Sequence, residues 1–209
     1  MVKNYIVVDI VYNKVNSTKE MIMSMRLVQT TFFSVLLLLV SIPASAFNGI
    51  PDKLSVGGKQ VVLNGAGTRT KFIISVYNMG LYLQKKSNNA QQIISANEAM
   101  AIRIQVVSGF ASAAKISQAF KTGFHNATGG KTAPIQPQIN QFLKSAFGTS
   151  VKKGDIFDFA YTPAGGVKVS KNNKGLTVVK GLPFKQALVG IWLSNKPAQG
   201  SLKNQLLGK

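Results

Sequence analysis

The chain has 209 residues, with 25 Lys and Arg against 6 Asp and Glu, and a formal net charge of +19 at pH 7. It contains no cysteine and only one histidine, so disulfides, thiol catalysis and iron–sulfur ligation are excluded and most zinc chemistry is disfavoured. A surplus of positive charge of this size attracts anions of many kinds, including nucleic acids, lipid headgroups and lipopolysaccharide.

Residues 25–46 have the pattern of a secretory signal peptide. Arg26 precedes an apolar run at 32–40, Pro43 breaks the run, and 44–46 have the small-x-small spacing of a cleavage site. A membrane anchor is the alternative, but the run is shorter than the roughly 20 residues that span a bilayer. We therefore expect cleavage and export, with the bacterial periplasm as the destination.

Residues 1–24 do not fit a signal peptide, because they are polar and mixed in character and include two acidic residues. We interpret them as a mis-assigned extension, with translation starting at Met21, Met23 or Met25. The working protein is then a single domain at 47–209. Removing the four basic and two acidic residues that precede this domain leaves 21 basic and 4 acidic residues, a net charge of +17.

Strand character is indicated by alternating apolar positions and by β-branched and aromatic residues. The Gly57-Gly58 pair predicts a turn between the first two strands, and the third segment is expected to bend or turn near its start. The expected strands are 54–56, 59–63, 69–83, 100–107, 155–161, 167–169 and 176–179.

Helices are indicated where apolar residues recur at three- and four-residue spacing. The first such face runs from Phe110 to Phe124, and the second helix opens near Pro137 and ends at Gly148. The expected helices are 110–124, 137–147, 184–192 and 202–207. Strands, then helices, then strands and a final helix indicate an α+β fold, a largely antiparallel sheet with helices packed on one face.

Two stretches, 63–83 and 184–199 with its continuation to Gly208, resemble the chalcone isomerase-like family, particularly its exported bacterial members. The resemblance implies that family's open-faced sheet covered by helices. It also implies one of three roles, since the family contains flavonoid-cyclising plant enzymes, plastid fatty-acid binders and bacterial members of less certain role.

The resemblance implies that Arg69, after the Gly65-x-Gly67 element, holds the anionic oxygen of a ligand in an apolar cleft. A guanidinium suits this role because it stays charged and offers a planar fork of donors to a carboxylate. Tyr77 is the second residue carried over from the fatty-acid binders. On one regular strand Arg69 and Tyr77 would face the same side but lie roughly 26 Å apart. They can serve one headgroup only if the chain turns between them.

Three apolar residues, Ile73, Met79 and Leu81, are candidate lining of the cleft by strand parity. The plant cyclases also use a tyrosine and an asparagine on the following helix, and the nearest equivalents here are Ser112 and Ala119. These small residues cannot copy either role. The sequence therefore favours binding of a fatty-acid-like molecule over enzymatic activity, and an intramolecular lyase is the alternative.

Other sites are disfavoured. His125 has no partner pattern for catalysis, and Asp155 and Asp158 do not form a metal-ligating set, so we expect no metal and no cofactor. The lysines are dispersed and only two arginines follow the signal, which argues against specific nucleic-acid binding. Contact of the basic surface with anionic envelope surfaces is a third alternative. We expect three large aromatic residues to belong to the core: Phe147, Phe184 and Trp192.

Overall fold

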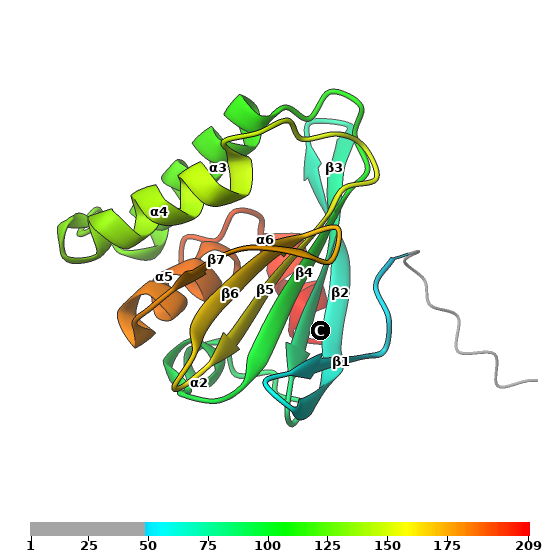
Figure 1. Ribbon diagram of the computed structural model, residues 1–209. Helices are drawn as coiled ribbons and strands as arrows, with labels where there is room; N and C mark the ends of the chain where they lie inside the picture. The colour runs from blue at the N-terminus through cyan, green and yellow to red at the C-terminus, as the bar shows by residue number, and fades with distance from the viewer. Residues whose placement is uncertain (1–48) are drawn as a thin grey trace, which may run out of the picture. The chain divides into compact units, whose positions relative to one another are not determined.

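The computed structural model describes residues 49–209, so the predictions made for 1–24 and for the signal peptide at 25–46 lie outside the described residues. Seven antiparallel strands form one sheet in their sequence order, from β1 at one edge to β7 at the other (Figure 1). The strands are β1 Lys53–Val56, β2 Lys59–Lys71, β3 Ile74–Leu83, β4 Met100–Val106, β5 Ile156–Thr162, β6 Gly166–Lys171 and β7 Lys174–Val179.

The helices cover one face of the sheet, as Figure 1 shows for α3, α4 and α5. This arrangement confirms the predicted α+β fold with a largely antiparallel sheet. Within the described residues, no helix has both the length and the apolar character needed to cross a membrane. The helices are α2 Ala90–Ser95, α3 Ala113–Ala127, the 3-10 helix η1 Ala133–Ile135, α4 Gln136–Phe147, α5 Leu182–Leu193 and α6 Gly200–Leu206.

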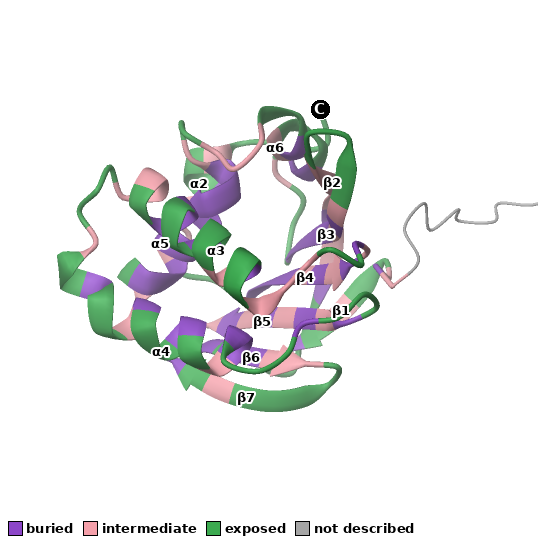
Figure 2. Ribbon diagram, turned by 90° about the horizontal axis from the view of Figure 1, so that it is seen from above, coloured by how far each residue is buried: buried purple, intermediate pink, exposed green. Residues whose placement is uncertain are grey.

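The main core lies between the helices and the sheet and is rich in aromatic rings. Phe120 of α3 has its ring centroid 4.9 Å from that of Phe147 and 5.6 Å from that of Trp192. α5 is buried along most of its length (Figure 2), because it packs between the sheet and the other helices. Phe147, Phe184 and Trp192 all belong to this core, as predicted.

A smaller apolar cluster covers part of the opposite face of the sheet, where Tyr82 packs with Ile50 and Val61. Beside it, Arg103 of β4 and Asp158 of β5 are register partners and form a two-point ion pair, at 2.7 Å and 2.9 Å. Hydrogen bonding to this carboxylate raises the pKa of Arg103. The two faces of the sheet therefore differ in character, apolar and aromatic under the helices and partly ionic on the other side.

The first long helix begins later than the sequence pattern predicted. Ser112 is the N-cap of α3 and accepts a hydrogen bond from the Lys115 backbone N–H, so Phe110 lies outside the helix. Its side chain is 74 % exposed. The regular three- and four-residue spacing therefore extended the predicted apolar face one turn too far.

The short helix α2 was not predicted from the sequence, and a buried lysine holds its C-terminal end. Lys185 of α5 is 1 % exposed, and its Nζ donates to the carbonyl oxygens of Ile93, Ile94 and Ala96 at 2.8–2.9 Å. A cation suits the C-terminal end of a helix, where carbonyl groups lack partners. Burial lowers the pKa of Lys185 to about 8, and the charge of Glu98 opposes this effect.

Candidate functional site

The β2–β3 hairpin brings Arg69 and Tyr77 together. The chain turns at Phe72 and Ile73, and Arg69 of β2 is the register partner of Tyr77 of β3. Register partners in an antiparallel pair share a face, with Cβ atoms roughly 5 Å apart. The chain therefore turns between Arg69 and Tyr77, which is the condition for both residues to contact one headgroup.

Asn64, Gly65 and Gly67 of β2 let α6 lie directly against this strand. A Cβ at Gly65 would overlap the carbonyl oxygen of Gln205, and one at Gly67 would overlap the Gln205 side chain. Asn64 Nδ2 donates to the carbonyl oxygen of Leu206 at 2.7 Å. Both glycines lie within β2, and their lack of a side chain permits the close packing of α6.

Gln199, which precedes α6, connects this helix to Arg69. Its Oε1 accepts hydrogen bonds from Arg69 Nη1 at 3.1 Å and from the Thr70 backbone N–H at 2.9 Å. Arg69 Nη1 also donates to the Thr70 carbonyl oxygen. Among residues 49–209 no ion pair includes Arg69. Its guanidinium is thus held by neutral groups, and its charge can attract an external anion.

Tyr77 is 8 % exposed, and its hydroxyl accepts a hydrogen bond from Trp192 Nε1 at 2.8 Å. Burial raises the pKa of Tyr77 to about 12, although the Trp192 hydrogen bond and the charge of Arg69 act in the opposite direction. The phenol therefore keeps its proton at neutral pH. Among the described residues the Tyr77 hydroxyl donates no hydrogen bond, so its proton can be donated to a ligand oxygen.

The three candidate lining residues have different positions. Met79 and Leu81 are each 1 % exposed and belong to the same core as Tyr77. Ile73 is 96 % exposed at the turn of the hairpin. The prediction from strand parity that Ile73 lines the cleft was wrong, because the chain turns at this residue, which is not part of a strand.

The remaining sequence candidates form no hydrogen bond with Arg69 or Tyr77 in the described residues. Ser112 caps α3, Ala119 is exposed, and His125 is exposed near the end of the same helix. Asp155 pairs with Lys171 at 2.7 Å. No cluster of three or more possible metal-ligating side chains is found in the described part of the chain.

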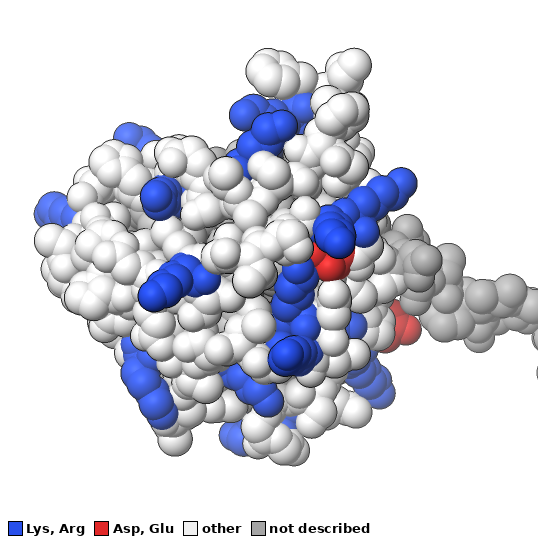
Figure 3. Space-filling model, turned by 45° about the horizontal axis from the view of Figure 1, so that its top comes forward, with Lys and Arg blue, Asp and Glu red and all other residues white. Residues whose placement is uncertain are grey.

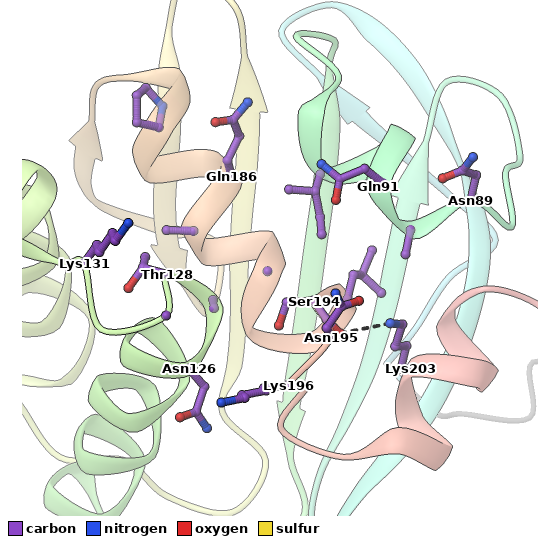
Figure 4. Close-up of a pocket in the computed structure, with 18 of the residues that line it drawn as sticks. Asn89, Gln91, Asn126, Thr128, Lys131, Gln186, Ser194, Asn195, Lys196 and Lys203 are labelled. Carbon is purple, nitrogen blue, oxygen red and sulfur yellow. Dashed lines mark hydrogen bonds between the residues drawn. The ribbon is translucent and has the colours of Figure 1, made fainter.

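A groove of about 1020 Å³ lies over α5, between α2, the end of α3 and α6 (Figure 4). Figure 4 shows Lys131 and Lys203 on opposite sides of α5, with Lys196 extending toward Asn126. Lys203 Nζ donates to the Ser194 carbonyl oxygen at 2.9 Å. The lining combines amides and lysines with apolar residues such as Ile94, Leu193 and Leu207, and it holds no Asp or Glu side chain. It includes neither Arg69 nor Tyr77. It is therefore distinct from the predicted ligand site.

Two residues that bond to the predicted pair, Gln199 to Arg69 and Trp192 to Tyr77, were not predicted as part of a site. Gln199 is separated from Arg69 by 130 positions, and Trp192 from Tyr77 by 115. No spacing rule connects residues so far apart. The signal that could have found Gln199 is its place inside the second stretch of the family resemblance.

The chain belongs to the chalcone isomerase-like family, whose sequence pattern matches residues 46–208. A solved structure of a fatty-acid binding protein from Arabidopsis thaliana is similar in fold, with a TM-score of 0.60 and 17% sequence identity over 76% of this chain and 90% of that chain. No curated protein shows significant similarity to the chain in a sequence search. The predicted family resemblance is confirmed.

Proposed function

We propose that this protein binds an apolar small molecule with an acidic group, such as a fatty acid, between the sheet and the helices. Arg69 holds the acid group and Tyr77 donates a second hydrogen bond to it. The observation that carries the proposal is the Arg69 guanidinium, which has neutral partners only and stands opposite Tyr77 at the border of an apolar core. Apolar sites with a few orienting polar groups are typical of small-molecule binding.

The apolar tail of the ligand would lie against β3, where Met79 and Leu81 are candidate lining. Both side chains are 1 % exposed, so a ligand can enter only if core side chains move apart. Met79 suits such a change because methionine is unbranched and adapts to irregular space. The groove over α5 has a mixed polar and apolar lining and contains neither Arg69 nor Tyr77, so the proposal does not place the ligand there.

The proposed activity is binding without catalysis. The chalcone isomerase-like family includes enzymes as well as fatty-acid binders, and the structural neighbour is a binder. A phenol with a pKa of about 12 is a poor general base at neutral pH, which argues against proton abstraction by Tyr77. An intramolecular lyase remains the alternative, and turnover of a chalcone that disappears in Arg69→Met would favour it.

The proposal includes export to the bacterial periplasm, on the signal pattern at 25–46. N-terminal sequencing of the protein recovered from the envelope of a bacterial host tests this part. Cleavage after Ala46 is expected, and an intact N-terminus on protein that remains in the cytoplasm would contradict it.

Binding is tested by mass spectrometry of organic extracts and by titration with palmitate. Wild type is compared with Arg69→Met and with Lys71→Met, which removes the same charge two positions along, at an exposed site. We expect Arg69→Met to weaken palmitate binding at least about tenfold, as loss of a charge-assisted hydrogen-bonded pair would. Lys71→Met should bind almost as well as wild type. Equal affinities for the two variants would refute the assignment of Arg69.

A further inference from the structure

Four large apolar side chains stand in solvent at one end of the sheet. Phe72 and Ile73, in the β2–β3 turn, are 90 % and 96 % exposed, and Ile74 is 42 % exposed. Phe110, in the loop between β4 and α3, is 74 % exposed. We refer to Phe72, Ile73, Ile74 and Phe110 as the apolar tip.

The two loops of the apolar tip are neighbours. The backbone N–H groups of Val107 and Ser108 both donate to the Val76 carbonyl oxygen, at 3.1 Å and 3.2 Å, so the second loop starts beside the first residues of β3. Both loops lie at the top of Figure 1. The apolar tip is therefore one surface feature and not a set of scattered side chains.

The conformation of Phe72 is unusual for a bulky residue. Its φ of 55° lies in the left-handed region, where glycine or asparagine is normally found. The hairpin turn thus carries a strained phenylalanine whose ring is exposed to water. Neither packing nor turn geometry accounts for an aromatic residue here, since asparagine would fit the turn better.

Exposed lysines surround the apolar tip. Lys71 precedes the turn, and Lys115 Nζ donates to the Phe110 carbonyl oxygen at 3.3 Å. Lys152 and Lys153 are exposed in the next loop along the sheet end, which the Gly154 N–H bonds to β4. The acidic residue of that loop, Asp155, is already paired with Lys171. Figure 3 shows one face of the molecule, with many basic residues and few acidic ones.

We propose that the apolar tip inserts into the interface of an anionic lipid bilayer, with the surrounding lysines on the lipid headgroups. Apolar side chains that enter the headgroup region and basic residues beside them both strengthen membrane association, and the two effects act together. The charge around the tip is positive, which complements an anionic bilayer. The inference goes beyond the proposed function, and it would put Arg69, three positions from Phe72, next to a membrane that contains acidic lipids.

Sedimentation with vesicles tests the proposal in the absence of added fatty acid. Wild type and Phe72→Ser/Ile73→Ser, purified with the same N-terminus as verified by mass spectrometry, are mixed with phosphatidylcholine vesicles with and without 30 mol% phosphatidylglycerol. Leu176→Ser/Val178→Ser is the matched control, since these residues are 37 % and 43 % exposed on the edge strand β7. Unfolding midpoints in urea verify that all variants are folded.

We expect wild type to bind the anionic vesicles, and the tip variant to bind at least about tenfold more weakly, from the apolar area that it no longer buries. The β7 control should bind like wild type. Lys71→Gln/Lys115→Gln should weaken binding to a smaller extent, and added salt should reduce wild-type binding without abolishing it. Equal binding of the tip variant and wild type, or no binding to anionic vesicles, would overturn the proposal. Failure of palmitate binding with intact vesicle binding would count against the proposed function alone.

Discussion

The two arginines of the domain sit on opposite faces of one sheet and differ in what neutralises them. Arg103 meets the Asp158 carboxylate through two hydrogen bonds, with both side chains 15% exposed. Arg69 meets an amide oxygen and a backbone carbonyl. A paired arginine connects two strands, whereas an arginine with only neutral partners keeps a charge that no carboxylate in the described residues neutralises. Residue type alone does not distinguish these roles.

The two tyrosines near these arginines differ in a similar way. Tyr77, opposite Arg69, accepts a hydrogen bond from Trp192 and retains a free proton. Tyr82, on the Arg103 face, has a buried hydroxyl without a hydrogen-bond partner among the described residues. Burial raises the pKa of Tyr82, as it does for Tyr77. Only Tyr77 is positioned to act together with its arginine.

The largest effect on stability is expected from breaking the Arg103 pair. Arg103→Leu should lower the free energy of unfolding by about 2–4 kcal/mol, because it leaves the Asp158 carboxylate half-buried and unpaired. Arg69→Met, whose lost partners are neutral and polar, should lower it by about 1 kcal/mol or less. Urea denaturation of both variants measures the difference. If Arg69→Met cost as much as Arg103→Leu, the two arginines would not have the distinct roles assigned to them.

The tyrosines provide the second test. Tyr77→Phe should lower the free energy of unfolding by about 1–2 kcal/mol, because Trp192 Nε1 loses its acceptor inside the core. Tyr82→Phe should be neutral or slightly stabilising, because the hydroxyl that it removes has no partner. Thermal unfolding monitored by circular dichroism ranks the two variants. A larger cost for Tyr82→Phe would mean that a water molecule or another group satisfies its hydroxyl.

A third cation, Lys185, is buried against carbonyl groups and should produce a pH dependence. Its pKa is about 8 in the folded protein, below the ordinary lysine value of 10.5, so between these values the unfolded chain binds more protons. Its contribution to stability therefore rises from about pH 8 to 10.5. The contribution of Tyr77, whose pKa is raised to about 12, falls only above about pH 10. Urea unfolding from pH 7 to 10 should show a rise in wild type that is smaller in Lys185→Met.

The sequence predicted the fold well because the determining signals are local. Glycine turns, alternating strands and the helix-starting Pro137 each act within a few residues. The errors also arose because these signals are local. The apolar spacing predicted a helix from Phe110 and did not indicate that Ser112 is its N-cap. The strand pattern of 69–83 did not locate the turn at Phe72 and Ile73.

The candidate site was predicted only in part, because its contacts join distant segments. Arg69 and Tyr77 came from the family resemblance, and their proximity depended on a turn that the sequence left open. Gln199 reaches Arg69 only because Gly65 and Gly67 allow α6 to pack on β2. No local pattern indicates that packing. The polar partner of the arginine therefore had to be learned from the structure.

A small change in stability, together with a large effect on ligand binding, is expected from Gln199→Glu. The substitution keeps the shape of the side chain but places a carboxylate beside Arg69. This would create, on the face of the sheet that the helices cover, an arginine–carboxylate pair like that of Arg103 and Asp158 on the other face. An ion pair at this half-buried position should change the free energy of unfolding by about 1 kcal/mol or less.

Palmitate affinity should nevertheless fall by about tenfold or more, because the new carboxylate competes with the acid group of the ligand for the same guanidinium. Titration of Gln199→Glu and Gln199→Met separates this competition from simple loss of the amide. Equal affinities for the two variants would mean that the charge of Arg69 does not select the ligand. A selective loss in Gln199→Glu would show that neutral partners are what keep Arg69 available for an anionic ligand.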